Sequence, residues 1–289
     1  MNGKLLSVYG LKWNPFSAEV PIEALRLPAV VNHFLWRIEQ LVRQGGFALI
    51  TGDPGTGKSV ALRALFEQLS QLRDVRVGVL TRPQSILADF YRELGELFGV
   101  ELSPHNRWAG AKVLRERWQA HIEAVSLRPV LLVDEAQEML PNVLNELRLL
   151  STSRLDSHLL VTVVLAGDSR LPALLRRPEL LPLASRIHVR LALAPSTAQE
   201  LAESLRHLIE QAGNSHLLTE PLLGALCDHA LGNYRTLMCM ADELLVEALR
   251  RDLPQLDEKL FLELFNPPLP AKRPTPATER GAAAGARRR

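Results

Sequence analysis

Cysteine, aromatic residues and long apolar runs are scarce in this sequence, and each scarcity excludes a class of protein. Two cysteines are too few for a disulfide-bonded scaffold and fit a reducing compartment, so we expect Cys227 and Cys239 to be small buried residues on helices. Aromatic residues make up 5% of the chain, which leaves the core mainly to Leu, Val and Ala. No apolar run approaches the ~18 residues of a membrane span, and residues 1–9 lack the apolar stretch of a signal peptide. We therefore expect a cytoplasmic protein with no membrane span.

Net charge is also low, at +2, but it is unevenly distributed. The segment from Pro267 to Arg289 carries six Lys or Arg and one Glu, a local charge of +5, which leaves −3 for the rest of the chain. Its content of Pro, Ala, Gly and Arg predicts a disordered tail. A basic tail suits the phosphate backbone of DNA, and it equally suits a solubilising segment that has no partner. Both interpretations stay open.

Apolar patterns alternate between strand and helix over the first two thirds of the chain. Short apolar runs bounded by turn residues predict strands at 47–50, 75–80, 129–133, 159–166 and 187–193. Apolar residues at helical spacing predict helices at 30–42, 58–69, 84–98 and 112–125. The segment before the first helix is predicted to be a loop with aromatic residues. Alternating strands and helices imply a parallel sheet that is covered on both faces.

After Pro195 the pattern changes to helices alone, at 198–212, 221–231 and 235–250, with a weaker segment that ends near Phe265. The sequence therefore predicts an α/β fold with a five-stranded parallel sheet, followed by a small all-helical lid domain. The predicted parts are an N-terminal aromatic segment and helix over 1–46, the α/β domain over 47–195, the lid domain over 196–265 and the basic tail over 266–289.

A phosphate-binding loop pattern follows the first predicted strand and opens the next helix. Its residues are Gly52, Asp53, Pro54, Gly55, Thr56, Gly57, Lys58 and Ser59. Glycines let the backbone amides turn toward phosphates without a Cβ in the way, and the helix N-terminus faces the negative charge. We expect Lys58 to reach the β- and γ-phosphates of ATP and Ser59 to bind Mg²⁺.

Two acids end the third predicted strand. Asp134 and Glu135 directly follow the apolar run 130–133. Ligands of open α/β folds bind at the carboxyl edge of the sheet, where these side chains would lie. We expect Asp134 to hold Mg²⁺, and Glu135 to act as the catalytic base that orients the attacking water.

The loop and the acidic pair resemble those of the AAA+ superfamily of ATPases, and the resemblance implies further site residues. Asp168 matches the first sensor of the γ-phosphate, where a neutral polar residue is more usual and Ser169 could substitute. Arg235, in the run 232–235, matches the second sensor or is an ordinary arginine at a helix start. An arginine finger acts on the ATP of a neighbouring subunit in this superfamily. Arg186 is the candidate, with Arg176 and Arg177 as alternatives.

Within that superfamily the chain is most similar to the ExeA (general secretion pathway A) group. The resemblance is carried by the runs 9–11, 14–16, 134–137, 145–150 and 177–186. In that group the aromatic opening segment packs near the adenine, although Trp13 and Phe16 could equally be core residues here.

The group includes secretion ATPases that continue into a membrane span, and transposition ATPases similar in role to the phage Mu and Tn7 target-selection proteins. The fold is predicted to end near Phe265 with no membrane span, and this absence favours the second kind. The basic tail is compatible with it. We therefore expect an ATP-dependent regulator of DNA transposition that uses ATP and Mg²⁺, forms homo-oligomers in the ATP state, and has double-stranded DNA and a transposase as partners. Two alternatives are a soluble secretion or envelope-assembly ATPase and a slow nucleotide switch.

Overall fold

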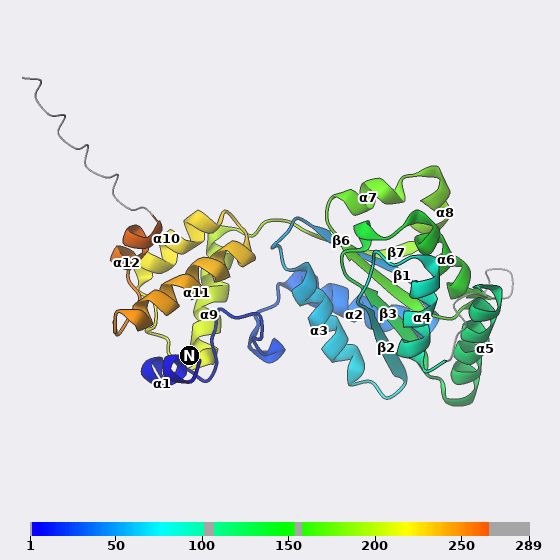
Figure 1. Cartoon of the computed structure of the whole chain (residues 1–289), viewed down its shortest axis with the longest axis horizontal. Coiled ribbons are helices and arrows are strands. Elements are labelled where there is room, and N and C mark those ends of the chain that lie inside the picture. Colours follow the sequence, from blue (N-terminus) through cyan, green and yellow to red (C-terminus); the bar gives the residue numbers. More distant parts are fainter. Residues whose placement is uncertain (1, 101–106, 154–157, 266–289) are drawn as a thin grey trace, which may run out of the picture.

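The computed structural model of the protein describes residues 2–100, 107–153 and 158–265. Figure 1 shows two lobes along the long axis: a sheet with helices on both of its faces, and a smaller group of helices. The predicted basic tail over 266–289 lies outside the described residues.

A five-stranded parallel sheet forms the centre of the larger lobe, in the order β2-β3-β6-β1-β7. Its strands are β1 (Gly46–Gly52), β2 (Val75–Leu80), β3 (Arg128–Val133), β6 (Thr162–Gly167) and β7 (Ile187–Leu193). The three inner strands are apolar and almost fully buried, as expected for parallel strands covered on both faces. This architecture confirms the predicted α/β class. Because β1 and β3 both flank β6, the loops that follow these three strands meet at one edge of the sheet.

Alternate residues of β1 point to opposite faces of the sheet and into separate cores. Phe47 and Leu49 are buried in one core, and Ala48 and Ile50 in the other. Helices with residues in the first core are α4 (Leu87–Phe98), α5 (Arg107–Val125), α6 (Pro141–Ser151), α7 (Arg170–Leu175) and α8 (Leu181–Ala184). Helices with residues in the second core are α2 (Ala29–Gln44) and α3 (Lys58–Ser70).

The smaller lobe is a helical lid. Its C-terminal helices are α9 (Ala198–Ala212), α10 (Glu220–Ala230), α11 (Tyr234–Arg250) and α12 (Glu258–Phe265). A capping box of Thr197 and Glu200 begins α9, where the Thr197 hydroxyl accepts from the N–H of Glu200. Apolar faces of all four helices share one core. The helical pattern predicted after residue 195 is confirmed.

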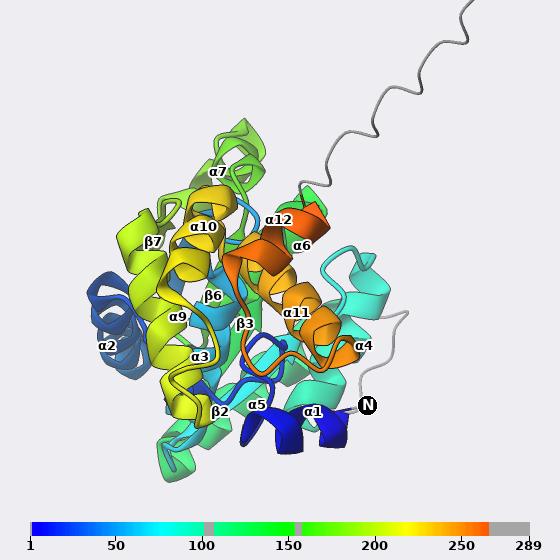
Figure 2. The same cartoon turned by 90° about the vertical axis from the view of Figure 1, so that its left-hand side faces the viewer.

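An additional helix, α1 (Asn2–Tyr9), lies where the sequence predicted a loop. Its Leu5 and Tyr9 are buried in the lid core, and the Tyr9 hydroxyl donates to the Leu253 carbonyl oxygen at 2.9 Å. Figure 2, with the lid toward the viewer, places α1 across the lower ends of α9 and α11. The prediction was wrong because the partners that stabilise this short helix come from the opposite end of the chain.

Two local details around the acidic pair also differ from the prediction. Helix α6 was not predicted, although its buried Val143, Leu144 and Leu147 have helical spacing. The predicted strand 159–166 is in fact divided: β5 (His158–Leu159) pairs antiparallel with β4 (Thr152–Ser153), and β6 begins only at Thr162. No helix among the described residues is both long and apolar enough to cross a bilayer.

Candidate active site

The phosphate-binding loop connects β1 to α3 at the carboxyl edge of the sheet. Gly55 and Gly57 have φ angles of 84° and 100°, left-handed values that residues with a Cβ rarely adopt. A Cβ on Gly55 would also lie 2.0 Å from Oδ1 of Asn233. Glycine is therefore required at position 55 both by the backbone and by the close approach of the lid.

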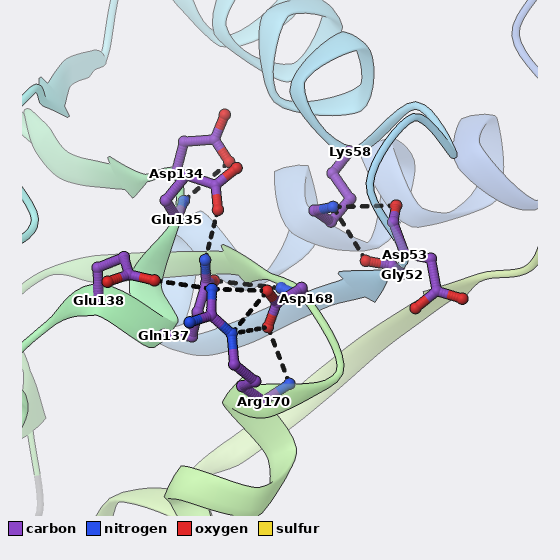
Figure 3. Close-up of polar contacts among 9 residues, drawn as sticks. All are labelled: Gly52, Asp53, Lys58, Asp134, Glu135, Gln137, Glu138, Asp168 and Arg170. Carbon is purple, nitrogen blue, oxygen red and sulfur yellow. Dashed lines mark hydrogen bonds and ion pairs between the residues drawn. The ribbon is translucent and has the colours of Figure 1, made fainter. Parts of the chain in front are cut away.

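Lys58 is almost buried at the start of α3, with an exposed fraction of 6%. Its Nζ donates to the carbonyl oxygens of Gly52 at 2.9 Å and Asp53 at 3.1 Å (Figure 3). Both partners are neutral, so they orient the ammonium group without cancelling its charge. A phosphate placed in this loop would therefore meet a preoriented cation.

Ser59 and Asp134 bring two oxygen donors together across the sheet edge. The Ser59 hydroxyl donates to Oδ2 of Asp134 at 2.8 Å. Mg²⁺ prefers hard oxygen ligands and commonly binds through one or two protein groups, with substrate phosphates and waters completing the octahedron. This pair fits such a site, and among the described residues no cluster of three or more His, Cys, Asp or Glu offers an alternative one.

Glu135 follows Asp134 with a φ of 51°, an uncommon left-handed value for a residue with a side chain. Its N–H donates to Oδ1 of Asp134 at 2.9 Å. Its exposed carboxylate lines the cavity described below and accepts a short hydrogen bond from the side-chain amide of Gln137. A carboxylate in this position can take a proton from a water held near the phosphates.

Asp168 directly follows β6. Its charge is compensated by Arg170, which was not predicted to take part in the site. Arg170 forms an ion pair with Asp168 at 2.8 Å, and the same guanidinium contacts Glu138 at 2.7 Å. Hydrogen bonding from Arg170 holds the pKa of Asp168 below its ordinary value, with the charge of Lys58 as a smaller contribution. The acid at the predicted sensor position therefore stays ionised but is engaged by Arg170. Ser169 is exposed beside it.

A cavity of about 730 Å³ opens beside the phosphate loop and lies between the two lobes. Its lining includes residues 54–61 of the loop and α3, Glu135, residues 192–196 at the end of β7 and directly after it, and the start of α11. Ligand cavities of ~300–1,000 Å³ take molecules of nucleotide size.

The lid contacts the phosphate loop directly through the start of α11. The Asn233 side chain donates to the Pro54 carbonyl oxygen at 3.0 Å, and the Tyr234 N–H donates to that of Gly55 at 3.0 Å. Asn233 also caps the helix by accepting from the Thr236 N–H at 3.1 Å. Arg235 follows, exposed on the cavity lining that also includes Lys58.

The N-terminal segment closes the side of the cavity away from the sheet edge. Phe16 is buried in the lid core and also lines the cavity, so both interpretations of its role are compatible with its position. Trp13 packs against the lid core, and the cavity lining does not include it. Cys227 is buried as predicted, whereas Cys239 is exposed on the cavity-facing side of α11, contrary to the prediction.

Arg186 lies apart from the cavity, in the turn between α8 and β7. Its guanidinium donates to the Pro182 carbonyl oxygen, and the cavity lining does not include it. Arg176 and Arg177 are exposed at the end of α7, also outside that lining. The fold thus gathers the phosphate loop, Asp134, Glu135, Asp168 and Arg235 at one site, and none of the three finger candidates.

Three residues of this site were missed as participants: Gln137, Arg170 and Asn233. A signal existed for Arg170, because an arginine two residues after the acid at a strand end can pair with it. The bonds of Gln137 to Asp168 and of Asn233 to Pro54 join residues far apart in sequence, so no local pattern could have shown them.

Comparison with known proteins agrees with the phosphate loop and the acidic pair described above. Residues 41–175 match the family described as AAA domain. General secretion pathway protein A of Aeromonas hydrophila is 34% identical over 205 residues, which cover 65% of this chain and 37% of that protein. The chain therefore spans little more than a third of the length of this relative.

Solved structures share the fold at low sequence identity. Cdc6p from Pyrobaculum aerophilum superimposes with a TM-score of 0.67 and 18% identity, covering 84% of this chain and 67% of that one. The Aeropyrum pernix ORC1 protein, solved in complex with DNA, gives a TM-score of 0.60 and 20% identity, covering 86% and 67%.

Proposed function

We propose that the chain hydrolyses ATP in the cavity between its lobes, assembles with copies of itself in the ATP state, and regulates DNA transposition on double-stranded DNA. The match of residues 41–175 to the AAA domain family and the fold shared with Cdc6p support the assignment as an ATPase of the AAA+ type. One observation carries the catalytic part: Lys58, the Ser59–Asp134 pair and Glu135 meet at a single edge of the sheet. We also propose that the chain is divided into an N-terminal segment, an α/β domain, a lid domain and a tail, with boundaries after residues 46, 195 and 265.

In this mechanism the phosphate loop binds the β- and γ-phosphates, and Lys58 exchanges its two carbonyl partners for phosphate oxygens. Mg²⁺, held by Ser59 and Asp134, would neutralise the charge that develops on the phosphates. Glu135 accepts a proton from water as the water oxygen attacks the γ-phosphorus. The bond from that phosphorus to the bridging oxygen breaks, and ADP and inorganic phosphate leave.

Two arginines complete the charge stabilisation from different directions. Arg235 reaches the phosphates from the lid of the same chain, where it already lines the cavity. Arg186 lies outside its own cavity, and this position supports action on the ATP of a neighbouring copy. Hydrolysis would then require an oligomer, since the site of one chain lacks its finger.

A DNA partner is supported by the fold shared with the Aeropyrum pernix ORC1 protein, which was solved in complex with DNA. The transposase partner rests on the sequence resemblance to transposition ATPases. We expect duplex DNA to shift with this protein at ~50 mM salt in the presence of a non-hydrolysable ATP analogue, and much less with ADP. Affinity should fall steeply as salt rises, because binding through phosphate contacts releases counterions.

A role in secretion is the second candidate, and a specific observation favours it: the 34% identity to general secretion pathway protein A. Failure to bind DNA with the ATP analogue at ~50 mM salt, where phosphate contacts are strong, would contradict the transposition role. Intact ATPase activity in the same preparation would then direct the search to a partner in secretion or envelope assembly.

A slow nucleotide switch is the third candidate, because the acid at the sensor position is engaged by Arg170. Turnover that is slow and that DNA fails to accelerate would support this reading. Acceleration of turnover by DNA would contradict it.

A further inference from the structure

The side chain of Gln137 connects the ends of two neighbouring strands of the sheet. Its Nε2 donates a short hydrogen bond to Oε2 of Glu135, which follows β3. Its Oε1 accepts from the backbone N–H of Asp168, which follows β6, at 3.1 Å (Figure 3). One amide therefore bridges the acid of the active site and the backbone of the adjacent strand.

The chemistry of these partners allows only one orientation of the amide. A backbone N–H can only donate, so the carbonyl end of Gln137 must face Asp168. The NH₂ end must then face the carboxylate of Glu135, which can only accept when it is ionised. The bridge is thus directional, and neither end is interchangeable.

Steric space for this bridge is provided at the end of β6. A Cβ added to Gly167 would lie 2.5 Å from Oε1 of Gln137, closer than real Cβ atoms approach. Gly167 has no left-handed φ that would explain a glycine by backbone conformation. The missing side chain at this position leaves room for the amide.

Glu135 has few other restraints on its side chain. It is exposed, and among the described residues no second side chain hydrogen-bonds its carboxylate. A freely rotating carboxylate would spend little time directed at the attacking water, and misplacement by about 1 Å can lower a rate by roughly 100-fold. The bond from Gln137 removes that freedom.

We propose that Gln137 is the positioning residue of the catalytic base: it holds Glu135 in the direction that accepts the proton of the attacking water, and it fixes that direction to the end of β6. The inference rests on the proposed function, in which Glu135 is the base. Through this bridge a displacement of the Asp168 backbone reaches the base by way of two hydrogen bonds.

Two substitutions test the bridge in the full chain. Gln137→Leu removes both hydrogen bonds at similar volume. Gln137→Glu keeps the acceptor for Asp168 but sets a second carboxylate against Glu135. We expect kcat for ATP hydrolysis to fall by about 10- to 100-fold in both variants, with unchanged KM for ATP and unchanged ADP affinity. Gln119→Leu, which removes a similar bond from Gln119 to Glu123 on α5, should keep the wild-type kcat.

A double mutant separates positioning from a general structural effect. Once Glu135→Gln has removed the base, adding Gln137→Leu should lower the residual rate no further. An unchanged or raised kcat in Gln137→Leu would overturn the inference, as would an equal loss in both backgrounds. Should Gln137→Leu fail to fold, Gln137→Glu carries the test. A normal rate in Glu135→Gln itself would instead refute the proposed base, so the two failures are distinguishable.

Discussion

The two sides of the cavity are built in different ways. The phosphate side, formed by residues 52–59 with Asp134 and Glu135, lies on one edge of a buried parallel sheet. The lid side, formed by residues of the segment 15–31 and the start of α11, is held by contacts between distant segments. Asn233 bonds to Pro54 across 179 residues, and Asn14 bonds to Asp242 at 2.8 Å across 228.

This difference suits the two sides to different tasks: the phosphate side to catalysis, and the lid side to closing over the nucleotide. Groups fixed to a rigid sheet edge keep the spacing that phosphoryl transfer needs. A lid that contacts the phosphate loop through a few hydrogen bonds can change its orientation relative to that loop at small energetic cost, as elements that open and close around ligands must. We therefore expect substitutions of the catalytic groups on the phosphate side to abolish or greatly slow turnover, and substitutions of lid residues that only contact the loop, such as Asn233, to change nucleotide affinity by small factors.

The largest effect should come from Glu135→Gln. The variant keeps the shape and the contact with Gln137 but cannot accept a proton, so kcat should fall by about 10²- to 10⁴-fold. ATP should still bind and persist, and ATP-bound oligomers should accumulate in sedimentation. Hydrolysis at the wild-type rate would assign the base elsewhere.

Next in size is Arg186→Ala, which tests whether a third region, on a neighbouring copy, completes the phosphate side. Nucleotide binding should be normal while hydrolysis falls by about 10²-fold or more. Mixing with Lys58→Ala protein should restore part of the activity, because one composite site then has both an intact loop and an intact finger. No rescue at any mixing ratio, with both proteins folded and associating, would count against action between subunits.

A smaller effect is expected from Asn233→Ala on the lid side. Loss of one hydrogen bond to the loop should weaken ATP binding by about 3- to 10-fold, measured by titration calorimetry. Thr219→Ala is the matched control, because Thr219 caps α10 by accepting from the Leu222 N–H. Both variants lose a helix cap, and only Asn233→Ala should lose affinity. Equal losses in the two would mean that lid stability, and not contact with the loop, sets affinity.

The smallest effect should follow Arg170→Ala. The pKa of Asp168 lies below its ordinary value near 3.8, so the pair stabilises the fold fully above that value and loses this contribution as pH falls through the lower folded pKa. Above about pH 5 the wild type should melt a few degrees higher than the variant, and the gap should narrow progressively as pH falls below about 4. Calorimetric scans at several pH values would show this trend, and a pH-independent gap would contradict it.

The two sides also differ in how far the sequence predicted them. The strands, the phosphate loop and the acidic pair are local patterns, and the structure places them at one sheet edge. Helix α1 was missed because its stabilising partners, such as Leu253, are more than two hundred residues away. The bonds of Asn233 to Pro54 and of Gln137 to Asp168 also join residues that are distant in sequence, 179 and 31 residues apart. Contacts formed only by the tertiary fold leave no spacing to recognise in the sequence.

The central claim is that this cavity binds and hydrolyses ATP through Lys58. Phosphate release by the purified chain should be compared with that of Lys58→Ala at saturating ATP and Mg²⁺, with equilibrium binding of an ATP analogue measured on the same preparations. We predict turnover in the wild type, no detectable turnover in the variant and much weaker analogue binding, since the phosphates lose their main point charge. Equal rates of phosphate release in the two proteins would contradict the account.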